Sequence, residues 1–162
     1  MTPETIRSAA FEHRTAKRWI LDLRGEARET AWTLVPLCLG AGKRIAAKFV
    51  CPVFRSSAFG AGEWTRSIPL ELTPGPWSFG GELVALIDER TQSQSELAAL
   101  MVRSVGGWLV GSTTAGAVGD VTEIDLGDNS VLSFSGQRVT DQCGGSVHRV
   151  GITPRVLVTV RR

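Results

Sequence analysis

The sequence has few of the residues that build metal sites, disulfide frameworks or pH-sensitive clusters. Its 162 residues contain three cysteines and two histidines. The cysteines, Cys38, Cys51 and Cys143, are odd in number and form no Cys-x-x-Cys pair, which argues against both a disulfide framework and a zinc site. We therefore expect no metal and no cofactor, and we expect these cysteines to be buried thiols in a reducing compartment.

Charge of one sign is also scarce, because the formal net charge is only +2. The basic residues are scattered over segments 14–18, 43–44 and 161–162, without closely interleaved aromatic residues. Solvated surfaces are the expected role of such segments, and no nucleic-acid partner is indicated.

Long apolar runs are missing too. No stretch approaches the roughly 20 residues that a membrane-spanning helix needs, and the first residues contain no apolar core of an export signal. The sequence thus predicts no membrane span and favours a cytoplasmic location for the chain as given. An extracytoplasmic location stays open if the chain is a fragment of a longer precursor.

What is present fits a globular protein. Apolar residues make up 43% of the chain and charged residues 21%, with no long polar tract of the kind that stays disordered. A chain of this length can bury about 70% of its unfolded surface in a single core. We expect one domain over residues 1–162.

Apolar periodicity and turn residues predict an α/β fold. The expected helices cover residues 3–17 and 29–39, the second one bent or interrupted by Pro36, and a third follows Ser93 and stops at Gly106 and Gly107. Strands are expected at residues 19–23, 44–53, 80–87, 108–111, 121–126, 131–134 and 156–160. The strand at residues 80–87 is almost continuously apolar and is expected to be buried on both faces.

A connection rich in proline, glycine and serine is predicted over residues 54–79. It is long for a loop in a compact domain, so it is either a lid or substrate edge, or an irregular segment held to the core by Trp64 and Trp77.

Ser93 stands at the sharp turn between the strand at residues 80–87 and the following helix. Such a turn can expose a nucleophile beside free backbone N–H groups that receive an oxyanion. The segment Ser93-Gln-Ser-Glu96 also fits a capping box, in which the serine only caps the helix and the glutamate reaches back to the cap amide. The local pattern leaves both readings open.

Four motifs in order resemble the catalytic core of C-terminal processing (tail-specific) peptidases, a group that includes the tricorn core. They are Trp19-Ile-Leu-Asp-Leu-Arg-Gly25, Thr91-Gln-Ser-Gln-Ser-Glu96, Gly107-Trp-Leu-Val-Gly-Ser-Thr-Thr-Ala-Gly116 and Gly151-Ile-Thr-Pro-Arg-Val156. The resemblance implies a ClpP/crotonase-like core of mixed sheets with flanking helices, a peptide or protein substrate, and Ser93 as the nucleophile. A homo-oligomer or a missing N-terminal region are further expectations.

The resemblance breaks at the general base. In the tail-specific branch the base is a lysine, and the matching position here is Ala117. In the tricorn-like branch a histidine from a region before the core serves as base. His148 lies near the closing motif and is the candidate base here, with a structural or surface histidine as the alternative; His13 sits on a charged helix and is expected to be solvated. Candidate orienting groups are Asp120, Glu123 and Asp141.

The oxyanion side departs as well. Where the family has Asn-x-Gly-Gly after the first strand, this chain reads Glu26-Ala-Arg-Glu29, which lacks the glycines that a positive φ favours. The backbone N–H of Gln94 remains as a donor, because every residue type except proline has this group.

Three functions stay open at this point. The first is a serine peptidase that forms an acyl-enzyme on Ser93, and the second is a catalytically impaired relative that binds peptides or serves in assembly. The third is a small-molecule enzyme on the crotonase-like scaffold, because the fold alone does not fix the function.

Overall fold

The computed structural model describes residues 2–26, 28–53 and 64–158, apart from the side chains of residues 28 and 64. Its helices are α1 (Pro3–Glu12), α2 (Arg28–Leu34), the 3-10 helix η1 (Val35–Cys38) and α3 (Gln94–Ser104). Its strands are β1 (Arg18–Asp22), β2 (Arg44–Val53), β3 (Trp64–Leu72), β4 (Glu82–Ile87), β5 (Trp108–Gly111), β6 (Val121–Gly127), β7 (Ser130–Ser135), β8 (Arg138–Asp141) and β9 (Val156–Leu157).

A parallel sheet carries the first motif on β1, the third on β5 and the end of the fourth on β9, while the second motif follows its strand β4 and enters α3. Its strand order is β1-β4-β5-β9, and each strand runs parallel to its neighbour. The central strand β4 buries Leu83, Ala85 and Ile87, while Val84 and Leu86 on its other face are half-buried. Burial of this strand is therefore confirmed fully for one face and partly for the other.

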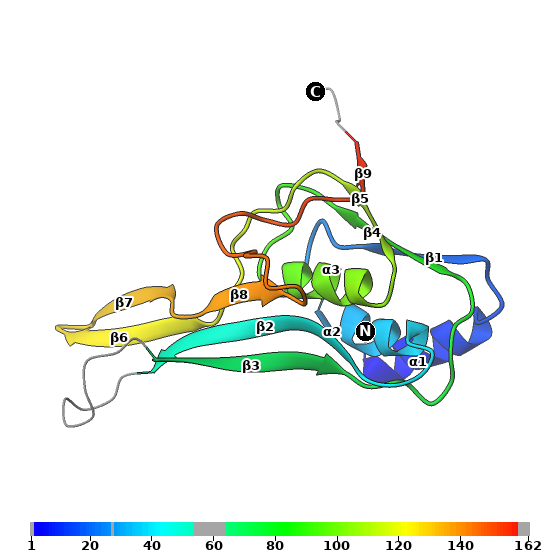
Figure 1. Cartoon of the computed structure of the whole chain (residues 1–162), viewed down its shortest axis with the longest axis horizontal. Coiled ribbons are helices and arrows are strands. Elements are labelled where there is room, and N and C mark those ends of the chain that lie inside the picture. The colour runs from blue at the N-terminus through cyan, green and yellow to red at the C-terminus, as the bar shows by residue number, and fades with distance from the viewer. Residues whose placement is uncertain (1, 27, 54–63, 159–162) are drawn as a thin grey trace.

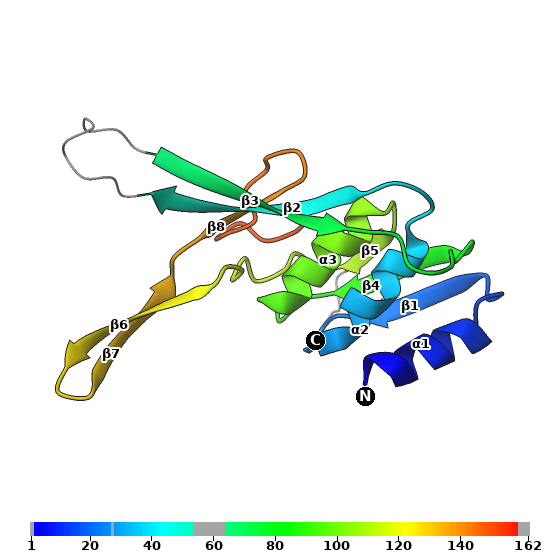
Figure 2. The same cartoon turned by 90° about the horizontal axis from the view of Figure 1, so that it is seen from below.

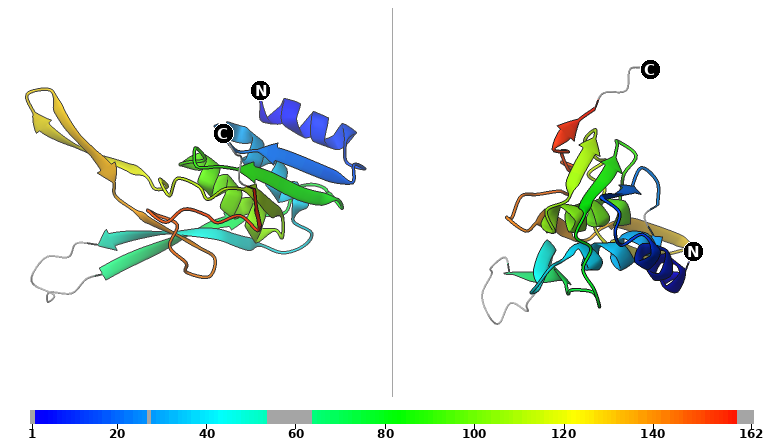
Figure 3. Two further views of the ribbon diagram at one scale, coloured as in Figure 1. Left: turned by 90° about the horizontal axis from the view of Figure 1, so that it is seen from above. Right: turned by 90° about the vertical axis from the view of Figure 1, so that its right-hand side faces the viewer.

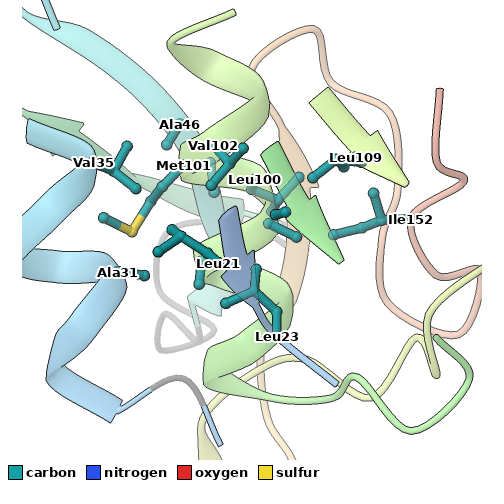
Figure 4. Close-up of a cluster of buried hydrophobic side chains, with 14 of the residues drawn as sticks. Leu21, Leu23, Ala31, Val35, Ala46, Leu100, Met101, Val102, Leu109 and Ile152 are labelled. Carbon is teal, nitrogen blue, oxygen red and sulfur yellow. The ribbon is translucent and has the colours of Figure 1, made fainter. Parts of the chain in front are cut away.

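An antiparallel sheet of order β3-β2-β8 lies on the other side of α3 (Figure 1). Helix α3 contacts β2 on one side and β4 and β5 on the other, with α2 beside it. Leu100, Met101 and Val102 of this helix are almost completely buried, and they meet Leu21 of β1 and Val35 of η1 in the core (Figure 4). This mixed architecture confirms the predicted α/β class.

A two-stranded hairpin of β6 and β7 projects from the body, as two views show (Figures 2 and 3). Its turn places Asp128 and Asn129 at positive φ, which is the geometry of a tight hairpin turn. Every residue of both strands is exposed, including Leu126 and Phe134. The hairpin predicted from Gly127-Asp-Asn-Ser130 is confirmed, although its exposure was not predicted.

The predicted helices are confirmed with different ends. Helix α1 stops at Glu12 instead of continuing to residue 17, and the next residues form turns in which Ala16 N–H donates to the carbonyl of His13. The second helix is interrupted at Pro36 as expected, because α2 ends at Leu34 and a 3-10 turn carries the proline in its first positions. The strands at residues 44–53 and 108–111 have the predicted bounds.

The prediction of an irregular connection over residues 54–79 is wrong for the middle part of this segment. Residues 64–72 form β3, which pairs antiparallel with β2 over its whole length, and residues 54–63 lie outside the described part of the chain. The strand includes Pro69, which a β-strand tolerates best at the edge of a sheet, where β3 lies. A proline-containing segment can therefore form a regular strand that the sequence pattern does not predict.

Aromatic side chains hold the end of this segment against the body. Phe79 stacks on Trp19 with ring centroids 3.8 Å apart, and Trp77 meets both Trp19 and Phe11 edge to face. The expected anchoring is thus confirmed for Trp77, whereas the side chain of Trp64 lies outside the described atoms.

Two other expectations need correction. The strand predicted at residues 156–160 is described only as Val156–Leu157, and residues 159–160 lie outside the described range. The cysteines are free but not all buried: Cys38 and Cys51 are half-buried and Cys143 is exposed, because it lies in the turn after β8. None of the described helices is both long and apolar enough to cross a bilayer.

Candidate active site

The turn between β4 and α3 holds Ser93 in an unusual backbone conformation. Its φ is 52° and its ψ is −122°, a region in which residues with a side chain are rarely found. Strain of this kind costs about 1–3 kcal/mol and persists only where the surroundings impose it. The backbone N–H of Ser93 donates to the carbonyl of Ala117 at 3.0 Å, which is one of the contacts that fix the turn.

The capping-box reading is wrong for this turn. Ser93 occupies the N-cap position of α3, but its side chain makes no capping hydrogen bond. Glu96 does not reach back to the cap amide, because that amide already donates to Ala117 and the Glu96 carboxylate points elsewhere. The hydroxyl of Ser93 is consequently not used to satisfy the helix end.

The hydroxyls on both sides of Ser93 tie the turn to the end of β1. Thr91 Oγ1 donates to the carbonyl of Leu23 at 3.0 Å and accepts from the backbone N–H of Asp88. Ser95 Oγ donates to the carbonyl of Gly25 at 2.6 Å. The Thr91–Leu23 bond is buried and the Ser95–Gly25 bond is partly buried, and together they hold the first and second motifs to each other.

Glu96 links the second motif to the third and fourth. Its side chain is completely buried, and its Oε1 accepts from Thr114 Oγ1 and from the backbone N–H of Gly116 at 2.8 Å. Thr114 Oγ1 in turn accepts from the backbone N–H of Ile152 at 2.8 Å. Within the described residues Glu96 Oε2 has no hydrogen-bond partner. This carboxylate is a structural bridge beneath the turn.

Two glycines allow the third and fourth motifs to touch backbone to backbone. Gly116 and Gly151 both have positive φ, of 69° and 80°. A Cβ on Gly116 would collide with the backbone of Val150 and Gly151, and a Cβ on Gly151 would collide with the carbonyl of Thr114. Glycine is therefore required at both positions by conformation and by space.

A cavity of about 490 Å³ opens at Ser93. Its lining comes from the segment after β1, the turn before α3 and the first residues of α3, with Gly25, Glu26, Arg90, Gln92, Ser93, Gln94 and Ser95. In the first turn of α3 the amides of Ser95, Glu96 and Leu97 all donate to backbone carbonyls. No acceptor is recorded among the described atoms for the amide of Gln94, so this N–H is available to a ligand in the cavity.

Paired charges lie beside this cavity. Hydrogen bonds from Arg24 hold the pKa of Asp22 at about 2, although partial burial acts in the opposite direction. Burial also raises the pKa of Asp88, but hydrogen bonds from the side chain and backbone of Arg90 outweigh it and leave the pKa lower than usual. Both carboxylates are thus ionised at neutral pH and are unsuited to donating a proton.

His148 contacts the segment that binds the Ser93 turn, but it is not among the residues that line the cavity. Its Nδ1 is 3.0 Å from the carbonyl of Val118, the residue after the Ala117 that binds the Ser93 amide. No hydrogen bond between Ser93 and His148 is recorded in the described structure. The structure therefore brings the two residues to neighbouring segments without joining their side chains.

The other candidate residues do not line the cavity at Ser93. His13 is exposed after α1, and its carbonyl accepts from the Trp19 indole. Asp141 binds Arg103 and the amides of its own turn, while Glu123 is exposed on the projecting hairpin and Asp120 is exposed just before it. Among the described residues no cluster of His, Cys, Asp or Glu has the arrangement of a metal site.

The sequence did not predict the roles of the hydroxyls around Ser93. Thr91, Ser95 and Thr114 stand in the recognised motifs, yet nothing local shows that their partners lie on other strands. The signal that was available is the repetition of small hydroxyl residues on both sides of Ser93.

Known structures share this fold at low sequence identity. They include a protein from Parabacteroides merdae described as a peptidase (TM-score 0.78, 16% identity) and mature CPAF in complex with lactacystin (TM-score 0.75, 14% identity). A third is the photosystem II D1 C-terminal processing protease (TM-score 0.67, 19% identity). The alignments cover 99%, 95% and 97% of this chain but only 51%, 42% and 39% of those chains. This chain therefore spans about half of their length or less.

No curated protein matches the sequence significantly. The sequence model of the family described as "Peptidase family S41" matches residues 3–158, which is nearly the whole chain. The chain belongs to peptidase family S41.

Proposed function

We propose that the chain is the core of a serine peptidase that cleaves a peptide bond through an acyl-enzyme on Ser93. The observation that carries this proposal is the conformation of Ser93, which is strained and leaves the hydroxyl free beside a cavity. A serine that merely caps a helix gains nothing from such strain, whereas a nucleophile at a sharp turn gains exposure.

The chemistry requires a base and an oxyanion donor. Ser93 Oγ attacks the carbonyl carbon of the substrate, its proton passes to the base, and the carbonyl oxygen becomes an oxyanion. The Gln94 N–H is the proposed donor to that oxyanion, because it follows Ser93 directly and has no recorded acceptor in the described structure. The base then protonates the departing amine, and a water molecule releases the acyl group.

His148 is the proposed base. If its Nδ1 carries the proton and donates to the carbonyl of Val118, then Nε2 is the acceptor that a general base needs. Hydrogen bonds in an unliganded site are often long and tighten only when substrate binds. A modest movement of the segment around His148 is therefore part of this proposal.

A specific observation favours a second candidate, a catalytically impaired relative that binds peptides or serves in assembly. Ala117 stands at the lysine position of the resemblance and offers Ser93 only its backbone carbonyl. Loss of one oxyanion donor costs about a hundred- to a thousandfold in kcat, and loss of the base adds to it. In this candidate, His148 remains a structural histidine.

Labelling with a fluorophosphonate separates the two candidates. The protein is treated beside Ser93→Ala and His148→Ala variants, and mass spectrometry locates the adduct. The peptidase proposal predicts an adduct on Ser93 that both variants lack. Absence of an adduct in a folded wild-type chain would favour the impaired relative, and an adduct that survives in His148→Ala would remove His148 as the base.

A further inference from the structure

The outer edge of β1 carries backbone groups that no described strand uses. β1 is the terminal strand of its sheet. The residues that flank it bond to β4: the carbonyl of Lys17 accepts from Glu82 N–H, and Leu23 N–H donates to the carbonyl of Leu86. Because alternate residues of a strand direct their backbone groups to opposite edges, Arg18, Ile20 and Asp22 direct theirs outward. No partner is recorded for these outward groups within residues 2–26, 28–53 and 64–158.

An apolar groove runs beside this edge. It has a volume of about 440 Å³ and lies between α1, β1 and α2, with Ile6, Ala9, Ala10, Trp19, Ile20 and Leu34 among its lining. Ile20 is 62% exposed and contributes apolar surface to the groove. The groove thus presents apolar surface next to free hydrogen-bonding groups.

The groove continues toward Ser93. A smaller cavity of about 160 Å³ shares Ile20, Leu21 and Thr30 with the groove, and it shares Glu26 with the cavity at Ser93. The three hollows therefore adjoin one another, from the groove between α1 and α2 to the cavity at the candidate nucleophile.

We propose that a substrate peptide binds in extended form along the outer edge of β1. Its backbone adds to the sheet as a further strand, and an apolar side chain occupies the groove between α1 and α2 while the scissile bond lies at Ser93. Strand addition gives affinity through the main chain, and pockets for alternate side chains give specificity. This inference rests on the proposed peptidase function, because membership of a peptidase family is what makes a peptide the expected occupant.

Binding is measured on the Ser93→Ala chain, so that cleavage does not interfere. The probe is a fluorescein-labelled heptapeptide of alternating valine and threonine with lysine at both ends, and the readout is fluorescence anisotropy. Ala9→Trp fills the groove from α1, and Ser8→Trp is the matched control, because Ser8 is exposed on the same helix but does not line the groove. We expect Ala9→Trp to weaken binding by about tenfold, equivalent to roughly 1.4 kcal/mol, and Ser8→Trp to leave it unchanged.

A second probe tests the backbone contacts without any change to the protein. The same peptide with N-methyl groups on all its valines and threonines has no internal backbone N–H to donate to a strand edge, and we expect it to bind about tenfold more weakly. Equal binding of both probes, equal binding by both tryptophan variants, or no saturable binding at all would overturn the proposal. So would a change of oligomeric state in Ala9→Trp with unchanged peptide affinity, because the groove would then be a contact between copies.

The outcomes separate this inference from the proposed function. If Ala9→Trp weakens peptide binding but Ser93 is not labelled by the fluorophosphonate, the docking site stands and the peptidase proposal is rejected. If Ser93 forms an adduct but Ala9→Trp leaves the peptide affinity unchanged, the peptidase proposal stands and the docking site is rejected.

Discussion

The surroundings of Ser93 and the β6–β7 hairpin differ in which side chains they bury. Around Ser93 the polar side chains of Thr91, Glu96 and Thr114 are buried and hydrogen-bonded across segments far apart in the sequence. In the hairpin, apolar side chains such as Leu126 and Phe134 are exposed, and among the described strands β6 and β7 pair only with each other. Residue type alone thus misjudges burial in both regions, and the difference lies in long-range contacts.

The largest expected contrast comes from matched leucines. Leu100→Ala opens a cavity beneath the Ser93 helix and should lower the free energy of unfolding by about 2–5 kcal/mol. Leu126→Ala removes an exposed side chain of the hairpin and should change it by less than about 0.5 kcal/mol. Urea unfolding followed by tryptophan fluorescence measures both. A large loss in Leu126→Ala would mean that the hairpin packs against something that covers it.

Matched glutamates should give the next contrast. Glu96→Ala leaves the Thr114 hydroxyl and the Gly116 amide without their buried acceptor, so we expect a loss of about 2–3 kcal/mol. Glu123→Ala, on the exposed hairpin, should stay within about 0.5 kcal/mol of the parent. If both variants unfold at the same urea concentration, the Glu96 bridge contributes nothing and the comparison fails.

The smallest expected effect concerns thiol reactivity. Burial raises the pKa of Cys38 to about 12, so its reactive thiolate is scarce at pH 8, while Cys143 is exposed. Iodoacetamide should therefore modify Cys143 long before Cys38, as peptide mapping over time would show. In the unfolded chain Cys38 ionises near its ordinary pKa, so its contribution to stability falls as pH rises from about 9 to 12. Early modification of Cys38 under native conditions would contradict the partial burial of its thiol at the end of η1.

Local patterns predicted much of the fold. Apolar runs bounded by turn residues located β2 and β5 correctly, and Gly127-Asp-Asn-Ser130 located the hairpin. They failed where the pattern was weak or misleading. Pro69 and its neighbouring prolines made β3 resemble a loop, and β8 has a single apolar residue, Val139, so no apolar run marks it. Strand pairing supplied by β2 stabilises both of these strands.

The candidate site was predictable only in part. Ser93 and Gln94 follow from the turn and from the resemblance, and their surroundings in the structure support them as proposals. The capping box failed because Glu96 has better partners in Thr114 and Gly116, which lie 18 and 20 residues away. No local motif contains such partners, since they depend on how β5 and the following loop fold back over α3.

Whether the fold forces Ser93 into a strained conformation can be measured directly by comparing Ser93→Gly with Ser93→Ala in urea unfolding. Both variants lose the hydroxyl, but only glycine adopts φ 52° without a Cβ penalty, so Ser93→Gly should be the more stable by about 1 kcal/mol or more. Ser95 lies within α3 and gives the control with opposite sign, because Ser95→Gly should be less stable than Ser95→Ala by about 1 kcal/mol. If Ser93→Gly is no more stable than Ser93→Ala, the turn is not strained and the case for Ser93 as an exposed nucleophile loses its main support.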